Sequence, residues 1–234
     1  MISGLRVAWR AIRDTYDEMF FLAGVNTLAL LLCLPVVTLP PAIAGAAFVT
    51  HRTVHGRAFM PRDFWTGFRQ YFGASWKLAG VSLVGWLLLI MNLRFYAIQT
   101  TPAIRLALIP WGCAGVLWLF SQFYLMPILI SQEDKGVWAI FKTSFRLAVS
   151  RPFFNLVILV VVAFAAALML LSGIIAALLL ISFLTLTANA ALMFRTEPEQ
   201  WKAREEAEKA AKEEEKDRRS RAGRDTTGRR KRRR

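Results

Sequence analysis

Asp, Glu, Lys and Arg are absent from four long runs of this 234-residue sequence: 19–50, 78–93, 106–132 and 152–194. The longest run has 43 residues and the first has 32, whereas one helix needs only about 20 apolar residues to cross about 30 Å of hydrocarbon. A soluble domain would have to bury such helices on almost every side. The sequence therefore predicts an integral membrane protein.

Hydrophobic residues make up 56% of the chain, its mean hydropathy is +0.41, and its charges are gathered in a few segments. The run 152–194 is long enough for two spans, and Ser172-Gly173 suits the turn because glycine relaxes the backbone. We predict an all-α fold: a polytopic transmembrane bundle of five or six membrane helices, with amphipathic interfacial helices and a charged C-terminal helix. Residues 1–195 would form the membrane domain and 196–234 a cytoplasmic tail that is helical and then disordered.

Cysteine and histidine are scarce, with two of each in the chain. Cys33 and Cys113 both fall in apolar runs, where a thiol packs as a small hydrophobe, so we expect no disulfide between them. His51 and His55 are spaced to share one face of a helix, but no third metal ligand lies nearby in the sequence. We expect no metal site and no cofactor.

Acidic residues are missing from every predicted span. Ion-coupled transporters commonly place ionisable groups inside the membrane, so this absence disfavours an ion-coupled carrier. Phosphate-binding glycine loops, nucleophile motifs and supported pairs of carboxylates are also missing from the sequence. We expect a protein that is not an enzyme.

The distribution of Lys and Arg predicts the orientation in the membrane, because cytoplasmic loops carry the excess of basic residues. The connecting segments contain three basic residues in 1–18, five in 51–77, two in 94–105, four in 131–151, none at the Ser172 turn, and sixteen in 195–234. This pattern predicts a cytoplasmic C-terminus. The first apolar run is longer than a signal-peptide core, so we expect no cleavage.

The first run allows two interpretations because Pro35, Pro40 and Pro41 interrupt it. A single span over 19–39 would leave the N-terminus outside. A hairpin of spans 19–38 and 41–56, meeting at Pro40-Pro41, would leave it inside. The small residues after the break suit close helix contact, and the arginines before the run favour an inside N-terminus. We prefer the hairpin.

Two connecting segments have the pattern of helices that lie in the membrane interface. In 136–150, the apolar residues Val137, Trp138, Phe141 and Phe145 recur at helical spacing against basic residues. Segment 64–76 is similarly rich in aromatic residues. We expect both to anchor the bundle at the cytoplasmic headgroup level.

Polar side chains inside the spans are the main candidates for a function within the membrane. Such groups usually face the bundle and hold helices together, although they can also line a polar pathway. The candidates for either role are Asn26, Asn189, Gln122 and Asn155.

The tail changes character after residue 195. Thr196 to Glu199 fits a capping box, and pairs such as Glu205 with Lys209 support a solvated helix over 197–220. Anionic lipid headgroups are the expected partners of the basic end, through Arg229, Arg230, Lys231, Arg232, Arg233 and Arg234. Nucleic-acid or ribosome binding is the alternative for the same charge.

Part of the sequence resembles a known family. The stretch from Asn26 to Pro35, the proline break with the small-residue segment from Thr38 to Arg52, and the aromatic segment from Phe64 to Phe72 resemble the YesL-like bacterial membrane proteins. The Pro40-Pro41 pair departs from the Gly-Pro expected there, and the basic tail lies outside the resemblance. This family has no established biochemical activity, and its members are often associated with carbohydrate-uptake operons.

The resemblance implies a non-enzymatic accessory or regulatory component of carbohydrate uptake, with transporter subunits as partners. One alternative is small-solute permeation by an oligomer. The other is a membrane-tethered protein that binds nucleic acid or ribosomes through its basic tail.

Overall fold

The computed structural model describes residues 2–57, 60–132 and 136–231, and in these residues the secondary structure is helical without strands. The predicted all-α class is confirmed. The chain divides into two compact units, Met1–Leu192 and Met193–Arg234. The predicted domain boundary lay after residue 195.

The helices have the following bounds. They are α1 (Ile2–Asp17), α2 (Met19–Cys33), the short 3-10 helix η1 (Val36–Thr38), α3 (Leu39–Val54), α4 (Pro61–Gln70), α5 (Phe72–Ala97), α6 (Pro102–Arg105), α7 (Leu108–Ser131), α8 (Val137–Ser150), α9 (Pro152–Ser172), α10 (Ile174–Thr196) and α11 (Pro198–Lys231).

Four helical stretches of the described chain are long and apolar enough to cross a membrane: Phe72–Ala97, Pro102–Ser131, Pro152–Ser172 and Leu178–Thr196. Helices α1 and α2 together would supply a fifth span, but they are bent by 91° at the break between them. This is the multi-pass architecture that the charge-free runs predict.

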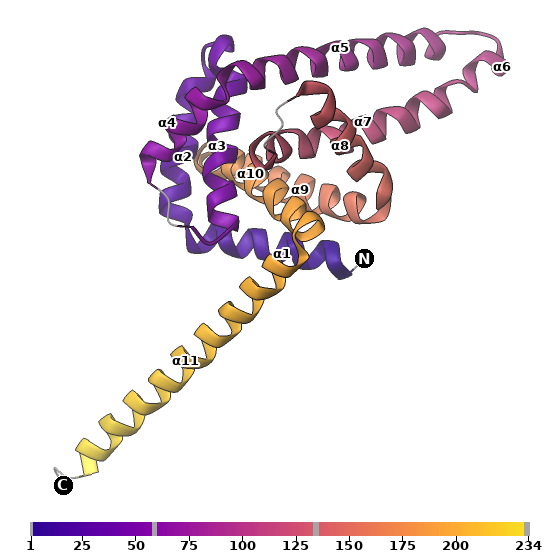
Figure 1. The fold of residues 1–234 in the computed structure, drawn as a ribbon. Coiled ribbons are helices and arrows are strands. Elements are labelled where there is room, and N and C mark those ends of the chain that lie inside the picture. The colour runs from indigo at the N-terminus through magenta and orange to yellow at the C-terminus, as the bar shows by residue number, and fades with distance from the viewer. Residues whose placement is uncertain (1, 58–59, 133–135, 232–234) are drawn as a thin grey trace. The chain divides into compact units, whose positions relative to one another are not determined.

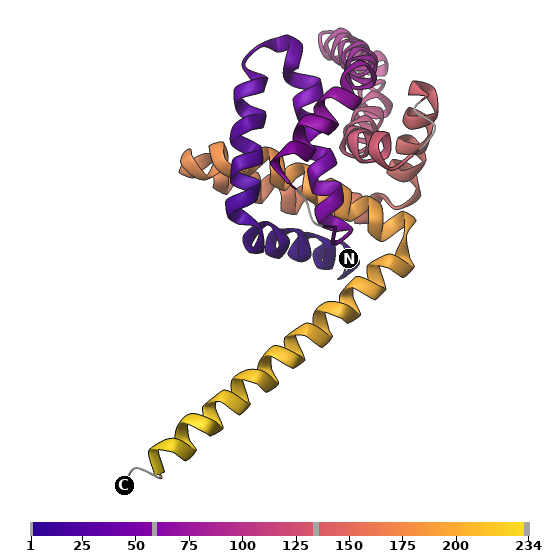
Figure 2. The ribbon, with the colours of Figure 1, turned by 60° about the vertical axis from the view of Figure 1, so that its left-hand side comes forward.

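The first charge-free run folds as the preferred hairpin, α2 followed by α3 (Figure 2). The predicted position of the break was wrong: α2 ends at Cys33, before Pro35, and Pro40 and Pro41 lie in the first turn of α3. A proline there costs no helical hydrogen bond, because the first N–H groups of a helix have no partner within it. The two helices have 15 and 16 residues, about 23 Å each at 1.5 Å per residue, which is less than the hydrocarbon thickness.

Helix α3 packs closely against α4, as the small residues in its sequence predicted. A Cβ added at Gly45 would lie 2.9 Å from the Phe64 carbonyl oxygen, and one added at Gly67 would lie 2.6 Å from the Cβ of Phe48. The two helices can therefore approach this closely only because both positions lack a side chain. The surrounding core consists of Val25, Ala29, Ala42, Ala46, Val49, Phe64 and Phe68.

The aromatic segment 64–76, predicted to be amphipathic, is helical but is shared between two helices. Helix α4 ends at Gln70, and α5 begins at Phe72, so the segment is divided at Tyr71. The N–H groups of Tyr71 and Ser75 bond the carbonyls of Gly67 and Tyr71, at 3.0 and 2.8 Å. The turn between α4 and α5 is therefore a continuation of hydrogen-bonded backbone and not a loop.

Helices α5 and α7 run side by side as a long hairpin that α6 closes, and it extends away from α2, α3 and α4 (Figure 1). The ring of Trp118 lies where a side chain at position 85 would be, since a Cβ added at Gly85 would lie 2.1 Å from it. Much of the α5 surface is exposed; Leu83 is 62% exposed and Met91 is 66% exposed. Such an apolar surface needs lipid or another protein to cover it.

Helix α8 confirms the helix predicted within 136–150, but its faces differ from the prediction. Ile140, Phe141, Ser144 and Ala148 are buried, whereas Trp138, Phe145 and Val149 are exposed together with Lys142 and Arg146. The apolar residues therefore divide between the bundle and an outer face. The outer face combines aromatic and basic side chains, which is typical of an interfacial helix.

The predicted turn between the last two spans is confirmed. Helix α9 ends at Ser172, and Gly173 follows with a φ of +60°, a conformation that favours glycine. Helix α1 packs on α9 at the other end, where a Cβ at Gly4 would lie 3.0 Å from Cγ1 of Val157.

The second unit contains the long helix α11. It continues past residue 220, where the sequence predicted its end, to Lys231. The predicted pair is present, with Lys209 Nζ at 3.1 Å from Glu205 Oε1. Phe194 and Trp201 meet edge to face with ring centroids 5.3 Å apart.

Candidate functional site

Asn26 joins α2 to α10. Its Oδ1 atom accepts the backbone N–H groups of Ile181 at 2.8 Å and Ser182 at 3.1 Å, and the Ser182 hydroxyl donates to the carbonyl of Leu22 at 3.1 Å. Asn26 and Ser182 are both 0% exposed. A polar group in hydrocarbon needs a hydrogen-bond partner within the protein. Here the Asn26 oxygen on α2 has its partners on α10, and the Ser182 hydroxyl on α10 has its partner on α2.

Asn189 joins α10 to α3 farther along. Its Nδ2 group donates to the carbonyls of Ala47 and Thr185 and to Oγ1 of Thr50, all at 3.0 Å. Asn189 is 1% exposed and Thr50 is 0% exposed. Helix α10 is thus bonded to both arms of the hairpin, to α2 through Asn26 and to α3 through Asn189.

His51 and His55 lie beside this second contact, near the end of α3. Their ring centroids are 4.1 Å apart, and Nδ1 of His55 lies 2.8 Å from the His51 carbonyl. His51 is outside the four candidate spans. Burial, followed by the charge of His55, lowers the pKa of His51 to about 4, although the Asn189 side chain acts in the opposite direction. His51 is therefore neutral at pH 7. Among the residues that were placed, no cluster of three metal-ligating side chains occurs.

Asn155 forms a separate polar contact among α7, α8 and α9. Its Oδ1 atom accepts the Tyr124 hydroxyl at 2.7 Å, and its Nδ2 group donates to the carbonyls of Leu147 and Ala148 at 3.2 and 2.9 Å. Those carbonyls belong to the last turn of α8, where helical partners are lacking. A neighbouring cavity has a volume of about 10 Å³, about enough for one water molecule.

Gln122 differs from the three asparagines. Its Nε2 group is enclosed on α7 without a hydrogen bond to any described residue, and so is the indole N–H of Trp118 one turn earlier. The structure does not bring Gln122 into any of the three asparagine contacts.

Three of the four predicted candidates thus lie at separate contacts in the bundle, and Gln122 belongs to none of them. Asn26, Asn155 and Asn189 are 0%, 4% and 1% exposed, and each is bonded to a neighbouring helix. This arrangement holds helices together and leaves these amides no exposed surface for a solute. Of the predicted lipid contacts, Arg229, Arg230 and Lys231 belong to α11, and Arg232, Arg233 and Arg234 lie outside the described residues.

Tyr124 was missed from the sequence as a member of these networks. Its signal was its position inside a charge-free run, because a tyrosine hydroxyl in hydrocarbon requires a hydrogen-bond partner. Tyr124 is 1% exposed, and its hydroxyl meets Asn155, 31 residues away in the chain.

The fold and these contacts define a multi-pass, all-α membrane protein whose buried asparagines are hydrogen-bonded between helices. Residues 22–93 match the family described as "Protein of unknown function, DUF624". The match extends from α2 to α5, and it includes the segments on which the YesL-like resemblance rested. No curated protein and no solved structure matches the chain.

Proposed function

We propose that this protein is a non-enzymatic accessory or regulatory subunit of a carbohydrate-uptake system in the bacterial inner membrane. The observation that carries the accessory role is the contrast between its interior and its surface. The asparagines of the interior are bonded to neighbouring helices, whereas the α5–α7 hairpin presents a broad apolar face. The carbohydrate system comes from the resemblance to the YesL-like family.

The hairpin face supports an interaction with another membrane protein. Leu83, Leu87 and Leu88 are 62%, 52% and 55% exposed, and Met91 is 66% exposed. In the membrane, helices associate by packing and not by the hydrophobic effect, so these exposed side chains would supply the packing surface for a partner helix.

The proposed topology places both termini in the cytoplasm. The α2–α3 hairpin enters and leaves on the same side, and four spans follow it. The basic segments 51–77 and 131–151 and the tail then all lie inside, as the positive-inside rule requires. Residues 94–105 and the Ser172 turn lie outside.

Affinity purification followed by mass spectrometry tests this function. The full-length protein and a version that ends at Phe194 are purified from their native host in a mild detergent, with an unrelated multi-pass protein as control. We expect subunits of a carbohydrate transporter with both versions and not with the control. Recovery of no transporter subunit with either version would contradict the accessory role, and recovery only with the full-length protein would move the interface to the tail.

Small-solute permeation is the alternative activity of the bundle, and it requires the asparagine contacts to open. Flux through liposomes that contain the protein, abolished by Asn26→Leu or Asn189→Leu, would replace the accessory role. Flux equal to that of empty liposomes agrees with the accessory role.

A further inference from the structure

An apolar groove lies between α2 and α4, apart from the polar contacts described above. Its volume is about 230 Å³. The lining side chains are Phe20, Phe21, Gly24, Val25, Leu28 and Phe64. From residue 20 to residue 28 the groove follows α2 for about 12 Å, at 1.5 Å per residue. It is therefore an elongated apolar surface on a helix that carries no charged residue.

Gly24 leaves space in this groove. A Cβ added at Gly24 would meet nothing within 4 Å, whereas Phe64 on the opposite side is 0% exposed and belongs to the α2–α3–α4 core. Phe20 is 88% exposed at the end of the groove. The groove is thus bounded by well-packed residues on one side and is open on the other.

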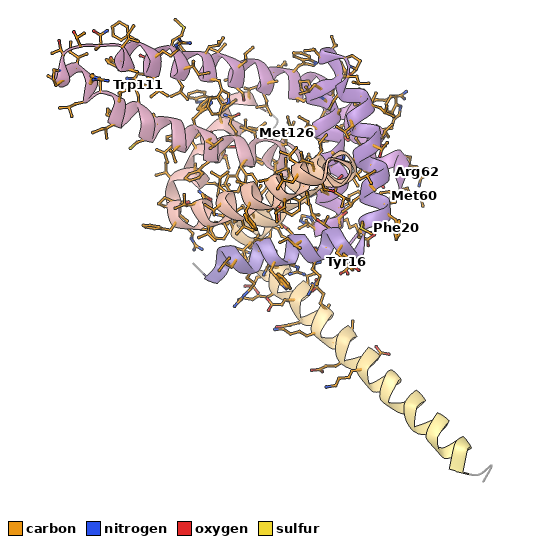
Figure 3. The ribbon with its side chains drawn as sticks, turned by 180° about the vertical axis from the view of Figure 1, so that it is seen from behind. Tyr16, Phe20, Met60, Arg62, Trp111 and Met126 are labelled. Atoms are coloured by element: carbon orange, nitrogen blue, oxygen red, sulfur yellow. The ribbon has the colours of Figure 1, made fainter. Side chains whose placement is uncertain are left out.

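The end of the groove near the start of α4 carries positive charge. Figure 3 shows Arg62, Met60, Phe20 and Tyr16 along one edge of the molecule. Arg62 is exposed in the first turn of α4. The negative charge of the neighbouring Asp63 is paired with a different arginine, because its carboxylate lies 3.6 Å from Nε of Arg52. It also accepts the N–H of Met60 at 2.7 Å.

Charges of the α1–α2 corner also lie near Phe20 in the chain. The Asp17 carboxylate lies 3.9 Å from Nε of Arg13, and Glu18 is exposed. Arg57 is a second exposed cation, at the end of the α3 turn. Arg62 makes no ion pair within the described part of the chain, so it presents an unpaired cation at the start of α4, on the edge that also carries Phe20 (Figure 3).

We propose that the groove binds an acyl chain of an anionic membrane phospholipid and that Arg62 binds its phosphate. A charge-free helix places the groove against hydrocarbon, where an acyl chain is the matching occupant. The planar guanidinium group of arginine suits the oxygens of a phosphate. A soluble anion could bind Arg62, but it would have no group to fill the apolar groove. A phospholipid has both an anionic headgroup for Arg62 and an acyl chain for the groove. This inference does not depend on the proposed transporter partner.

Filling the groove tests the acyl-chain site. Gly24→Leu places a side chain in the open space, and Gly80→Leu is the matched control, because Gly80 is equally open and lies away from the groove on α5. The full-length variants are purified in a mild detergent, and the bound phospholipid is measured by native mass spectrometry. We expect retained lipid in the wild type and in Gly80→Leu, and about tenfold less in Gly24→Leu, since losing the contacts of two methylenes already weakens binding by about this factor.

Three results would overturn the acyl-chain site: a wild type without bound phospholipid, equal retention in the two leucine variants, or masses in which a second protein chain replaces the lipid. A phospholipid with a photoreactive acyl chain gives a measurement that needs no variant. It is expected to label the peptide that contains residues 20–28, and labelling confined to other helices contradicts the site.

The phosphate contact has its own test. Arg62→Gln is compared with Arg94→Gln, which removes an exposed arginine from the far end of α5. We expect Arg62→Gln to lower the preference for anionic over zwitterionic phospholipid about fivefold, the effect of about one cation near the headgroups. Equal preferences in the two variants would remove Arg62 from the proposal and leave the groove assignment in place.

Discussion

Asn26 on α2 and Ser182 on α10 bind each other's helix: Asn26 accepts the backbone N–H of Ser182 at 3.1 Å, and the Ser182 hydroxyl donates to the Leu22 carbonyl one turn before Asn26. The same Asn26 oxygen also accepts the N–H of Ile181. Because the two residues are 156 positions apart, this contact joins the start of the membrane domain to its last helix.

Replacement of Asn26 should destabilise the bundle. Asn26→Leu removes the acceptor of two backbone N–H groups, which should lower the free energy of unfolding by about 1–2 kcal/mol. Asn92→Leu is the matched control, because within the described residues the Asn92 amide bonds the Leu88 carbonyl of its own helix, at 2.7 Å, and no other helix. Unfolding in mixed micelles with increasing SDS measures both. A loss no larger for Asn26→Leu than for Asn92→Leu would refute the role of this contact.

The Tyr124 hydroxyl should stabilise the folded protein through its hydrogen bond to Asn155. Tyr124→Phe keeps the ring and removes the 2.7 Å hydrogen bond, so we expect a loss of about 1 kcal/mol. Tyr96 is half-buried near the end of α5, and no hydrogen bond of its hydroxyl to another described residue is seen, so Tyr96→Phe should change stability by less than about 0.5 kcal/mol. The same SDS titration compares them, and equal effects would show that the Tyr124–Asn155 bond contributes nothing measurable.

The close approach of α3 and α4 predicts a steric effect at Gly45. In Gly45→Ala the new methyl group would lie 2.9 Å from the Phe64 carbonyl oxygen, which is backbone and cannot rotate away. We expect a loss of about 1–3 kcal/mol from overpacking. Gly80→Ala has open space and should be tolerated. Thermal unfolding followed by circular dichroism measures both, and an unchanged melting temperature for Gly45→Ala would contradict the packing.

Stability should fall as the pH falls below neutral, in part through His51. The pKa of His51 is lowered to about 4 in the folded protein from 6.5, so between these values the unfolded chain binds the proton more readily. The contribution of neutral His51 is therefore complete above pH 6.5 and is lost as the pH falls toward 4. Melting temperatures at pH 7 and pH 5 should differ less in His51→Gln than in the wild type. An identical difference would exclude His51 as a source of the pH dependence.

The membrane class and the last spans could be predicted because charge-free length and a glycine turn are local properties of the sequence. The break in the first run was misplaced, since a proline pair is as compatible with the first turn of a helix as with its end, and packing of α3 on α4 decides between them. The sequence could not show which apolar residues of α8 are buried and which are exposed, because that depends on the helices that pack against α8.

The candidate residues themselves could be found from the sequence, but their partners could not. An asparagine in a span requires a hydrogen bond, yet nothing local indicates that Asn189 meets Ala47 and Thr50 or that Asn155 caps α8. These pairs are set by the docking of helices that are far apart in the chain.

Site-specific photo-crosslinking from α5 tests most directly whether the exposed hairpin binds a partner. A photoreactive amino acid replaces Leu87 or Leu88, which are 52% and 55% exposed, or Leu89 as the buried control at 7%. In cells of the native host, we predict adducts with a carbohydrate-transporter subunit from the two exposed positions and none from Leu89. If the exposed positions yield no such adduct while the protein is folded in the membrane, the accessory role through this hairpin is contradicted.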